Sequence, residues 1–357
     1  MQHRGKLMRG KKRIVPALVV LFCGAAVLAG FYWYRTERQP VSYESSDFAM
    51  GTYIQQTVYG KNGEEAAKAA LGKITRLENE ISWRIDTSDV ARLNAAAGTD
   101  WISIDPETAS ILSASLDVAQ KSDGAYDPTI LPVSSLWDFG GENQHAPAKS
   151  EVQKFVQYVN YQDLRVDAKN SKASLKLHYM AIDLGGIGKG AACDDAIAAY
   201  RSAGAEYGII AVGGSIGVYG SKPDGSPWHI AIRDPDTKDD SAGSMGQIDL
   251  ASGFVSTSGT YEQTFTENGV TYHHLLNPKT GYPENNGLVS VTVKCDNGAL
   301  SDALSTACFV LGREKGEKLL ADYHAEGVFI DSANQVYVTG GLKDSFQITG
   351  GNYVLAK

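Results

Sequence analysis

The sequence predicts an α+β protein in which mixed sheets are flanked by helices. One observation is that strand-like segments follow one another along the second half of the chain, and a second is that helical segments stand among them. A third is composition: with 43% apolar and 21% charged residues over 357 positions, the chain is ordinary for a globular protein and can bury one large core or two packed ones. The strand-like segments are residues 206–220, 228–235, 254–259, 270–276 and 288–295.

The chain begins with a basic flank and an apolar run. Residues 1–13 contain six Lys and Arg and no acid, and residues 14–34 are long and apolar enough to cross a bilayer. We expect a transmembrane helix with the basic flank in the cytoplasm, and a cleaved signal peptide is the alternative. Residues 35–46 then form a polar tether, and the domain 47–357 lies outside the cytoplasm.

The remaining elements are predicted from the spacing of apolar residues and from the residues that typically start and end helices. A strand at 48–60 precedes a helix at 64–82, where Ala, Leu and Ile recur at three and four residues. A second helix is expected over 105–124, because Pro and acids stand at its start and Gly just past its end. Residues 145–159 form a polar insertion leading into a helix. Residues 180–204 form a strand, a glycine turn and a helix, and residues 299–323 form a helical region.

Charge and cysteine usage exclude several classes of site. Without the six cations of the basic flank, the formal net charge falls from −8 to −14, so an acidic body does not favour nucleic acid or anionic lipid as a partner. Cys193, Cys295 and Cys308 show no CxxC spacing. We therefore expect free thiols rather than a zinc site or a disulfide framework.

Residues 213–217, GGSIG, match the nucleophile elbow of serine hydrolases in their letters. That elbow needs a helix immediately after the serine, whereas the residues after Ser215 read as strand and turn. Glycines at a strand end, for close packing or for the approach of a ligand, explain the stretch as well.

Two segments carry the chemistry of a phosphate site and a metal site. Asp183 is followed by a glycine-rich turn, Lys189 and a helix, which would offer backbone N–H groups and a cation to a phosphate. The segment is not a Walker A loop, because Gly190 follows the lysine, and a purely structural turn is the alternative. Asp302 and Thr306 lie four apart on one helical face, and both are oxygen donors suited to Mg²⁺. An N-cap or a solvated face is the alternative there.

His273 and His274 stand side by side before a Pro-containing turn. Neighbours on a strand point to opposite faces, so only one of the two can serve a given site unless the chain bends. A histidine with a near-neutral pKa can act as a general base, and we assign this role to His274. Two half-buried strand histidines bonded to backbone are the alternative.

Eight segments occur together in an order and spacing that resemble the ApbE family, the FAD:protein FMN transferases. The resemblance covers about residues 47–355. The segments are FAMGT (48–52), DGAYDPTI (123–130), DLGGIGKG (183–190), AVGGSIGVYG (211–220), WHIAIRDP (228–235), VSTSGTYEQTF (255–265), HHLLNPKTGYP (273–283) and SDALSTACFVLG (301–312).

The resemblance implies an ApbE-like fold and a set of site residues. By motif, FAD would contact Met50, Trp83, Ala125, Tyr126, Asp127, Asp183, Lys189 and Leu276. Magnesium would be held by the backbone carbonyl of Gly186, by Asp302 and by Thr306, and His274 and Asp302 would be catalytic. The chain departs from the family at four positions: Trp83 stands where Tyr is frequent, Tyr126 where Phe is usual, Asn277 where Asp is frequent and Ser305 where some members have another acid.

The implied reaction is Mg²⁺-dependent transfer of FMN from FAD, as a phosphoester, to a Thr or Ser hydroxyl of an acceptor protein, with release of AMP. The expected acceptor is a membrane redox-pump subunit or an extracytoplasmic electron-transfer protein, and the expected location is the cytoplasmic membrane. Two alternatives stay open: an FAD pyrophosphatase that gives FMN and AMP, and a flavin-binding protein without turnover.

Overall fold

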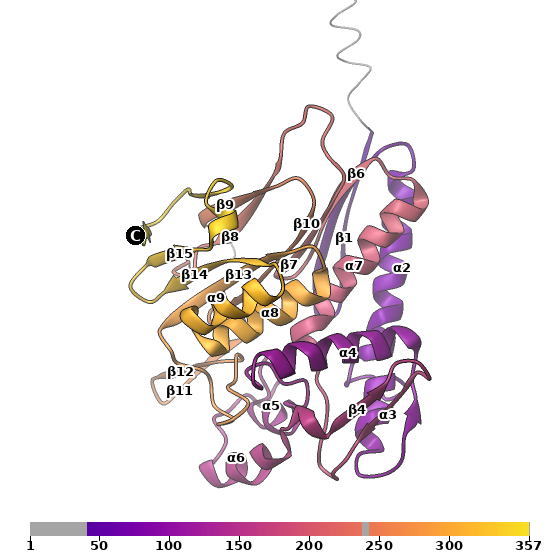
Figure 1. Cartoon of the computed structure of the whole chain (residues 1–357), viewed down its shortest axis with the longest axis vertical. Helices are drawn as coiled ribbons and strands as arrows, with labels where there is room; N and C mark the ends of the chain where they lie inside the picture. The colour runs from indigo at the N-terminus through magenta and orange to yellow at the C-terminus, as the bar shows by residue number, and fades with distance from the viewer. Residues whose placement is uncertain (1–40, 238–242, 357) are drawn as a thin grey trace, which may run out of the picture. The chain divides into compact units, whose positions relative to one another are not determined.

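The computed structural model describes residues 41–237 and 243–356, and the chain from Ser42 onward forms one compact unit (Figure 1). The predicted basic flank, 1–13, and apolar segment, 14–34, lie outside the described residues. Within the described ranges, no helix is long and apolar enough to cross a membrane. The predicted tether, 35–46, overlaps the first strand, because residues from Ser42 onward already pair with a neighbouring strand.

A nine-stranded sheet is the centre of this unit. Neighbouring strands are antiparallel except for the last pair, β15 and β17, which is parallel. In order across the sheet, the strands are β1 (Ser42–Ala49), β2 (Thr52–Tyr59), β6 (Tyr207–Val212), β7 (Ser215–Tyr219), β10 (Gly253–Gly259), β13 (Leu288–Cys295), β14 (Glu326–Asp331), β15 (Gln335–Val338) and β17 (Val354–Leu355).

Three smaller antiparallel sheets and the helices surround it. The sheets are β16 (Phe346–Ile348), β9 (Ser244–Leu250) and β8 (Trp228–Arg233); β3 (Ile102–Ser103), β5 (Lys172–Leu175) and β4 (Leu164–Asp167); and the hairpin of β11 (Thr264–Glu267) and β12 (Val270–His273). The helices are α2 (Gly63–Ile81), α3 (Asp89–Ala95), α4 (Pro106–Lys121), α5 (Leu131–Trp137), α6 (Lys149–Phe155), α7 (Gly185–Ala203), α8 (Gly298–Leu311) and α9 (Arg313–Asp322), with short 3₁₀ turns at Val156–Tyr158, Tyr161–Asp163 and Gly340–Leu342.

The two faces of the large sheet build separate apolar cores. On one face, Ile210 and Val293 pack against the helices, chiefly α2, α7 and α8. On the other face, Val218 and Val255 pack against the sheet β16-β9-β8. These side chains are almost fully removed from water, and each contributes about 1.5–3 kcal/mol of transfer free energy. The strand alternation of the sequence therefore supplies both cores at once.

A third apolar cluster lies where α5, α6 and the β11–β12 hairpin gather at one end of the unit (Figure 1). Trp137 is its centre: the ring contacts Tyr272 at 5.2 Å between centroids, and its indole N–H donates to the Gly281 carbonyl at 3.0 Å. Gly281 has φ +76°, and a Cβ there would meet Val152 at 2.6 Å. The cluster thus fixes the loop that follows the histidine pair.

Helices α7 and α8 cross in backbone contact. A Cβ on Gly190 would lie 2.0 Å from the Gly298 carbonyl oxygen, and one on Gly298 would lie 2.3 Å from the Gly190 oxygen. Asp194 of α7 reinforces the crossing, because its two carboxylate oxygens accept the N–H groups of Gly298 and Ala299, each at 2.8 Å. Only glycine fits at this crossing.

Most of the predicted elements are observed, but the single strand expected at 48–60 is a hairpin in which β1 turns into β2 at Met50 and Gly51. Helices expected at 64–82 and 105–124 are α2 and α4, and the Asp105 carboxylate caps α4 by accepting the Glu107 N–H at 2.8 Å. The strand expected near residue 180 is a single bridge between Ile130 and Ala181. In the GGSIG stretch, Gly213 and Gly214 form a tight turn and Ser215 begins β7, so a strand follows the serine as expected and the helix of a nucleophile elbow is absent there. The cysteines expected to be free, Cys193, Cys295 and Cys308, are buried free thiols.

Candidate active site

The first turn of α7 gathers a carboxylate and a cation. Asp183 accepts the Gly185 N–H at 2.8 Å, which anchors the start of the helix. Lys189, one turn on, donates to the Gly185 carbonyl at 2.9 Å and lies 3.7 Å from Asp302 Oδ1. Burial raises the pKa of Asp183, whereas the Gly185 N–H and the cations of Arg84 and Lys189 oppose the rise. A helix N-terminus beside a lysine suits an anionic ligand.

The α7–α8 crossing brings the three predicted magnesium ligands together. Asp302 is 3% exposed, and its Oδ2 accepts the Gly190 N–H at 3.0 Å. Thr306 lies one turn along α8, and a Cβ on Gly186 would be 3.5 Å from its Oγ1. A carboxylate, a hydroxyl and a main-chain carbonyl are the oxygen donors that Mg²⁺ takes, so these residues fit the ion.

The turn between β1 and β2 presents Met50 to α7. Met50 and Gly51 have φ of +56° and +68°, the left-handed pair of a two-residue type I′ hairpin. The Met50 N–H donates to Glu78 Oε1 of α2 at 2.8 Å, which holds this methionine in its unusual conformation. Its Cε lies 3.3 Å from where a Cβ on Gly188 would stand. The predicted flavin contact is therefore next to the glycine-rich helix start.

Trp83, Ala125 and Tyr126 lie around the same helix start. Trp83 follows α2, and a hydrogen bond from its side chain helps to lower the pKa of Asp183. The Arg84 guanidinium lies 4.2 Å from the centre of the Trp83 ring. Tyr126 is 4% exposed, and its ring is 3.1 Å from the Cβ position of Gly186; Ala125 beside it is also buried.

Asp127 belongs to the scaffold of this region. Its Oδ1 accepts the N–H and the hydroxyl of Thr129, at 2.8 and 2.6 Å, and its Oδ2 accepts the Tyr161 N–H at 2.9 Å. Burial raises its pKa, and these hydrogen bonds oppose the rise. A side-chain contact with FAD would compete with these three bonds, and the predicted role of Asp127 stays a prediction.

The two histidines differ in environment. His273, the last residue of β12, directs Nε2 to the Glu284 carbonyl at 3.1 Å, and its ring packs on Phe309 with 5.8 Å between centroids; its Nδ1, like that of His274, is buried without a hydrogen-bond partner among the described residues. His274 bonds to the Gln263 carbonyl through its backbone N–H at 3.1 Å, and its ring Nδ1 is buried with no hydrogen-bond partner in the described part of the chain. Burial and the nearby Lys189 cation lower the pKa of His274 to about 3. The ring is thus neutral near pH about 7 and lies beside the cation of the phosphate turn.

Leu276 and Asn277 close the histidine loop. Leu276 is 6% exposed and pairs with Pro283 across the loop. Asn277 Oδ1 accepts the Lys279 N–H at 2.9 Å, and its amide nitrogen donates to Glu284 at 2.6 Å. Asn277 therefore serves as a turn residue.

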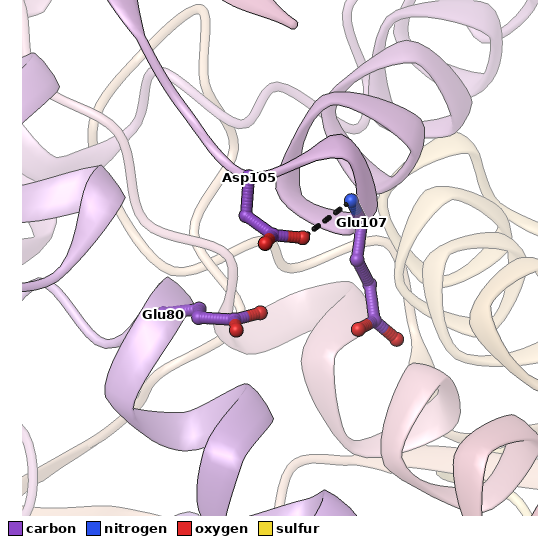
Figure 2. A group of neighbouring side chains, drawn as sticks. All are labelled: Glu80, Asp105 and Glu107. Carbon is purple, nitrogen blue, oxygen red and sulfur yellow. Dashed lines mark hydrogen bonds between the residues drawn. The ribbon is translucent and has the colours of Figure 1, made fainter.

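A second group of acids, Glu80, Asp105 and Glu107, has its oxygens close enough together to hold a metal ion (Figure 2). Arg76 already pairs with Glu80 at 2.7 Å and with Glu107. Burial, and then the neighbouring Asp195 carboxylate, raise the pKa of Glu107. Sequence reasoning did not find this group, because α2 and the start of α4 are distant along the chain and no metal-ligand spacing links them.

Sequence reasoning also missed the residues that support the site. Glu78 holds Met50, Asp194 holds the start of α8, and Ser258 of β10 contacts the Thr306 hydroxyl at 3.2 Å. The period of two along 254–259 places Ser256 and Ser258 on one face of a strand. Only the fold shows that this face lies under α8.

In sequence and in fold, the chain is similar to one group of known proteins. The sequence model of the ApbE family matches residues 50–329. An FAD:protein FMN transferase of Treponema pallidum is 28% identical over 361 aligned residues, which cover 96% of this chain and 98% of the relative.

Among solved structures, the ApbE protein of Thermotoga maritima superposes with a TM-score of 0.78 at 33% identity, over 85% of this chain and 99% of that one. The flavin transferase ApbE of Vibrio cholerae superposes with a TM-score of 0.75 at 26% identity, over 86% of this chain and 99% of that one.

Proposed function

The chain belongs to the ApbE family, and from this premise we propose that it is an FAD:protein FMN transferase that uses Mg²⁺. The observation that carries the proposal is the α7–α8 crossing, where Lys189 lies 3.7 Å from Asp302 Oδ1, Thr306 stands one turn along α8, and the Lys189 cation helps to lower the pKa of His274. A phosphate-suited helix start, a set of hard oxygen donors and a neutral imidazole are the parts that cleavage of a pyrophosphate needs.

FAD would bind with its pyrophosphate at the start of α7. Lys189 and the positive end of the helix would face the phosphate oxygens, and Met50, Trp83 and Tyr126 would line the flavin side. Asp183, held by the Gly185 N–H, would fix this helix start and contact FAD as well. Leu276 would approach through its backbone, because its side chain is packed in the Trp137 cluster.

Asp302, Thr306 and the Gly186 carbonyl would hold the magnesium ion. When bound, the ion supplies neutralisation of phosphate charge and Lewis-acid activation. Lys189, 3.7 Å from Asp302 Oδ1, would offer a second positive charge to the same pyrophosphate. Both positive groups then serve one anionic substrate.

The chemical step joins the acceptor hydroxyl to the FMN phosphorus. The acceptor oxygen forms a new P–O bond, the bond from that phosphorus to the oxygen bridging to AMP breaks, and AMP leaves with the electron pair. His274 would take the proton of the acceptor hydroxyl through a ring nitrogen, because its ring is neutral at pH about 7. Charge on the bound pyrophosphate would offset Lys189 and raise the low pKa of His274.

Two other readings use the same site. An FAD pyrophosphatase would pass the phosphorus to water and release FMN and AMP. A flavin carrier would need the pocket and would not need Asp302, Thr306 or His274, so the presence of these residues favours an enzyme.

We also propose that the protein acts at the outer side of the cytoplasmic membrane. The apolar run at 14–34 and the basic flank before it support an anchored enzyme. The acceptor would then be a redox-pump subunit or an electron-transfer protein that exposes a Thr or Ser outside the cytoplasm.

Intact-mass spectrometry tests the proposed function. Residues 40–357 are incubated with FAD, Mg²⁺ and an acceptor protein that bears a Thr flavinylation motif, and EDTA is added to the control. We expect the acceptor to gain the mass of one FMN ester, and EDTA to prevent it. Free FMN and AMP with an unmodified acceptor would support the pyrophosphatase, and intact bound FAD would support the carrier.

A further inference from the structure

We infer that Ser258 is a positioning residue that turns the lone pairs of the Thr306 hydroxyl toward the metal ion. The inference deepens the proposed function and rests on its metal site. A neutral hydroxyl binds a cation only through a lone pair, so its proton must point elsewhere. The residues that contact a ligating group from behind decide that direction.

Ser258 lies on β10 directly beneath α8. Its Oγ is 2.7 Å from Ser305 Oγ and 3.2 Å from Thr306 Oγ1. Ser258 is 7% exposed and Ser305 is fully buried, so water does not compete for these protons. The three hydroxyls form one short chain at the back of the proposed site.

The donor and acceptor roles of the three hydroxyls follow from counting their protons. Ser305 Oγ donates its one proton to the Asp302 carbonyl at 2.8 Å, so in its contact with Ser258 it must accept. Ser258 then donates to Ser305 and can only accept from Thr306. The Thr306 proton therefore points at β10, and its lone pairs point away from Ser258.

The same chain explains why Thr306 does not turn back on its own helix. A threonine in a helix commonly donates to the carbonyl four residues earlier, which here belongs to Asp302. Ser305 already donates to that carbonyl, and Ser258 offers an acceptor for Thr306 instead. Ser305, which stands where some relatives are expected to have an acid, thereby directs the proton chain rather than adding a ligand.

Ser256 provides a matched control on the same strand. Its Oγ contacts Ser215 at 3.0 Å and Ser301 of α8 at 2.7 Å, and Ser301 donates to the Gly298 carbonyl at 2.8 Å. Like Ser258 it is buried, faces α8 and bonds to a serine of that helix. In the described part of the chain its hydroxyl contacts Ser215 and Ser301 and not Thr306, so it shares the packing role and lacks the positioning role.

The test measures metal affinity without using the reaction. The full chain in detergent is saturated with FAD and titrated with Mn²⁺, and free Mn²⁺ is followed by electron paramagnetic resonance. We expect Ser258→Ala to weaken Mn²⁺ binding about 10-fold, as loss of an outer hydrogen bond to a metal ligand does. Ser256→Ala should bind like the wild type, and Ser258→Thr, which keeps the hydroxyl, should restore binding.

The outcomes separate this inference from the proposed function. Equal Mn²⁺ affinity in Ser258→Ala and Ser256→Ala would overturn the role of Ser258, and so would a wild type that binds no Mn²⁺. Tight Mn²⁺ binding with the expected loss in Ser258→Ala, in a protein that never modifies an acceptor, would support the inference and sink the transferase. If Ser258→Ala fails to fold, Ser258→Cys keeps the shape with a weaker donor and should also weaken Mn²⁺ binding.

Discussion

Two places near α7 offer carboxylate oxygens to a metal ion, and they differ in the number of acids and in what surrounds them. Glu80, Asp105 and Glu107 form the denser group (Figure 2). Arg76 is already paired to two of these acids. The α7–α8 crossing has one buried carboxylate, Asp302, beside a hydroxyl and a main-chain turn.

The difference shows that a count of acids is a poor guide to a metal site. In the dense group, Arg76 pairs directly with Glu80 and Glu107, and one oxygen of Asp105 accepts the N-cap bond, whereas Glu80 Oε2 is buried without a hydrogen-bond partner among the described residues. At the crossing, Asp302 has one oxygen on the Gly190 N–H, and the other faces a lysine at 3.7 Å, beyond hydrogen-bond distance. Because an arginine is in direct contact with two acids of the dense group, whereas the lysine at the crossing is beyond hydrogen-bond distance of Asp302, the crossing is the better candidate for a metal site. The predictions below test this contrast.

Asp302→Asn should cause the largest loss. Asparagine keeps an acceptor for the Gly190 N–H, so the protein should fold, but it lacks the charge that holds the metal. Because a bound metal supplies several kcal/mol, we expect transfer to fall about 100-fold or more. Acceptor flavinylation followed by mass spectrometry measures this, with the melting temperature as the folding control. Wild-type transfer in a folded variant would refute the assignment of Asp302.

His274→Ala should slow transfer about 100-fold and change FAD affinity little, because a general base acts on the acceptor proton rather than on FAD binding. Single-turnover rates and flavin-fluorescence titration separate the two effects. His273→Gln is the control: His273 bonds to the Glu284 carbonyl and packs on Phe309, so it should retain most of the rate. Equal losses in the two variants would remove the special role of His274.

A fall in pH should lower the free energy of unfolding more in the wild type than in the variant His274→Gln. The pKa of His274 is about 3 in the folded protein and about 6.5 when unfolded, so between these values the unfolded chain binds more protons. The contribution of neutral His274 to the free energy of unfolding is fully present above pH about 6.5. It is lost as the pH falls toward about 3. From pH about 7 to about 5, the wild type should lose about 1–2 kcal/mol relative to the variant.

Urea unfolding at several pH values measures this difference. Subtracting the variant removes the contribution of carboxyls whose pKa is raised by burial, such as Asp127 and Asp183, which act in the opposite direction in acid. A pH-independent difference would mean that His274 titrates normally in the folded protein.

Glu80→Gln should have the smallest effect. The change removes one helix ion pair with Arg76, which is worth about 0.3–0.5 kcal/mol, and relieves repulsion from Asp105. We expect transfer to stay at the wild-type rate and EDTA to shift the melting temperature of variant and wild type equally. A loss of transfer or of the EDTA response in Glu80→Gln would give the dense acidic group the metal role.

Much of the fold was readable from local pattern. Helix α4 has its start signalled by Asp105 and Pro106, and the period of two along β13 places Val291 and Val293 on one face. The strand near residue 180 was overpredicted, because an apolar run does not show whether a neighbouring strand is available for pairing. The expected start at residue 47 falls inside β1, because the polar residues 42–46 resemble a linker in sequence and are held by pairing with β2.

Site residues could be predicted only where one short motif holds the functional groups that suggest their role. Lys189 and Asp302 stood out because each occurs in a turn or a helical spacing with a chemical meaning. Ser258 and Glu78 did not, because their roles come from contacts with α8 and with the β1–β2 turn that no sequence spacing records. The scaffold bonds of Asp127 were hidden for the same reason.

The glycine crossing of α7 and α8 bears on the choice of ion. Gly190 and Gly298 touch through their main chains, so the separation between the Gly186 turn and Asp302 cannot widen without breaking that contact. Ca²⁺ needs longer bonds and more ligands than Mg²⁺. If the proposed metal site on α7 and α8 cannot expand, it selects ions by their radius. We therefore expect it to reject calcium even where calcium is the more abundant cation.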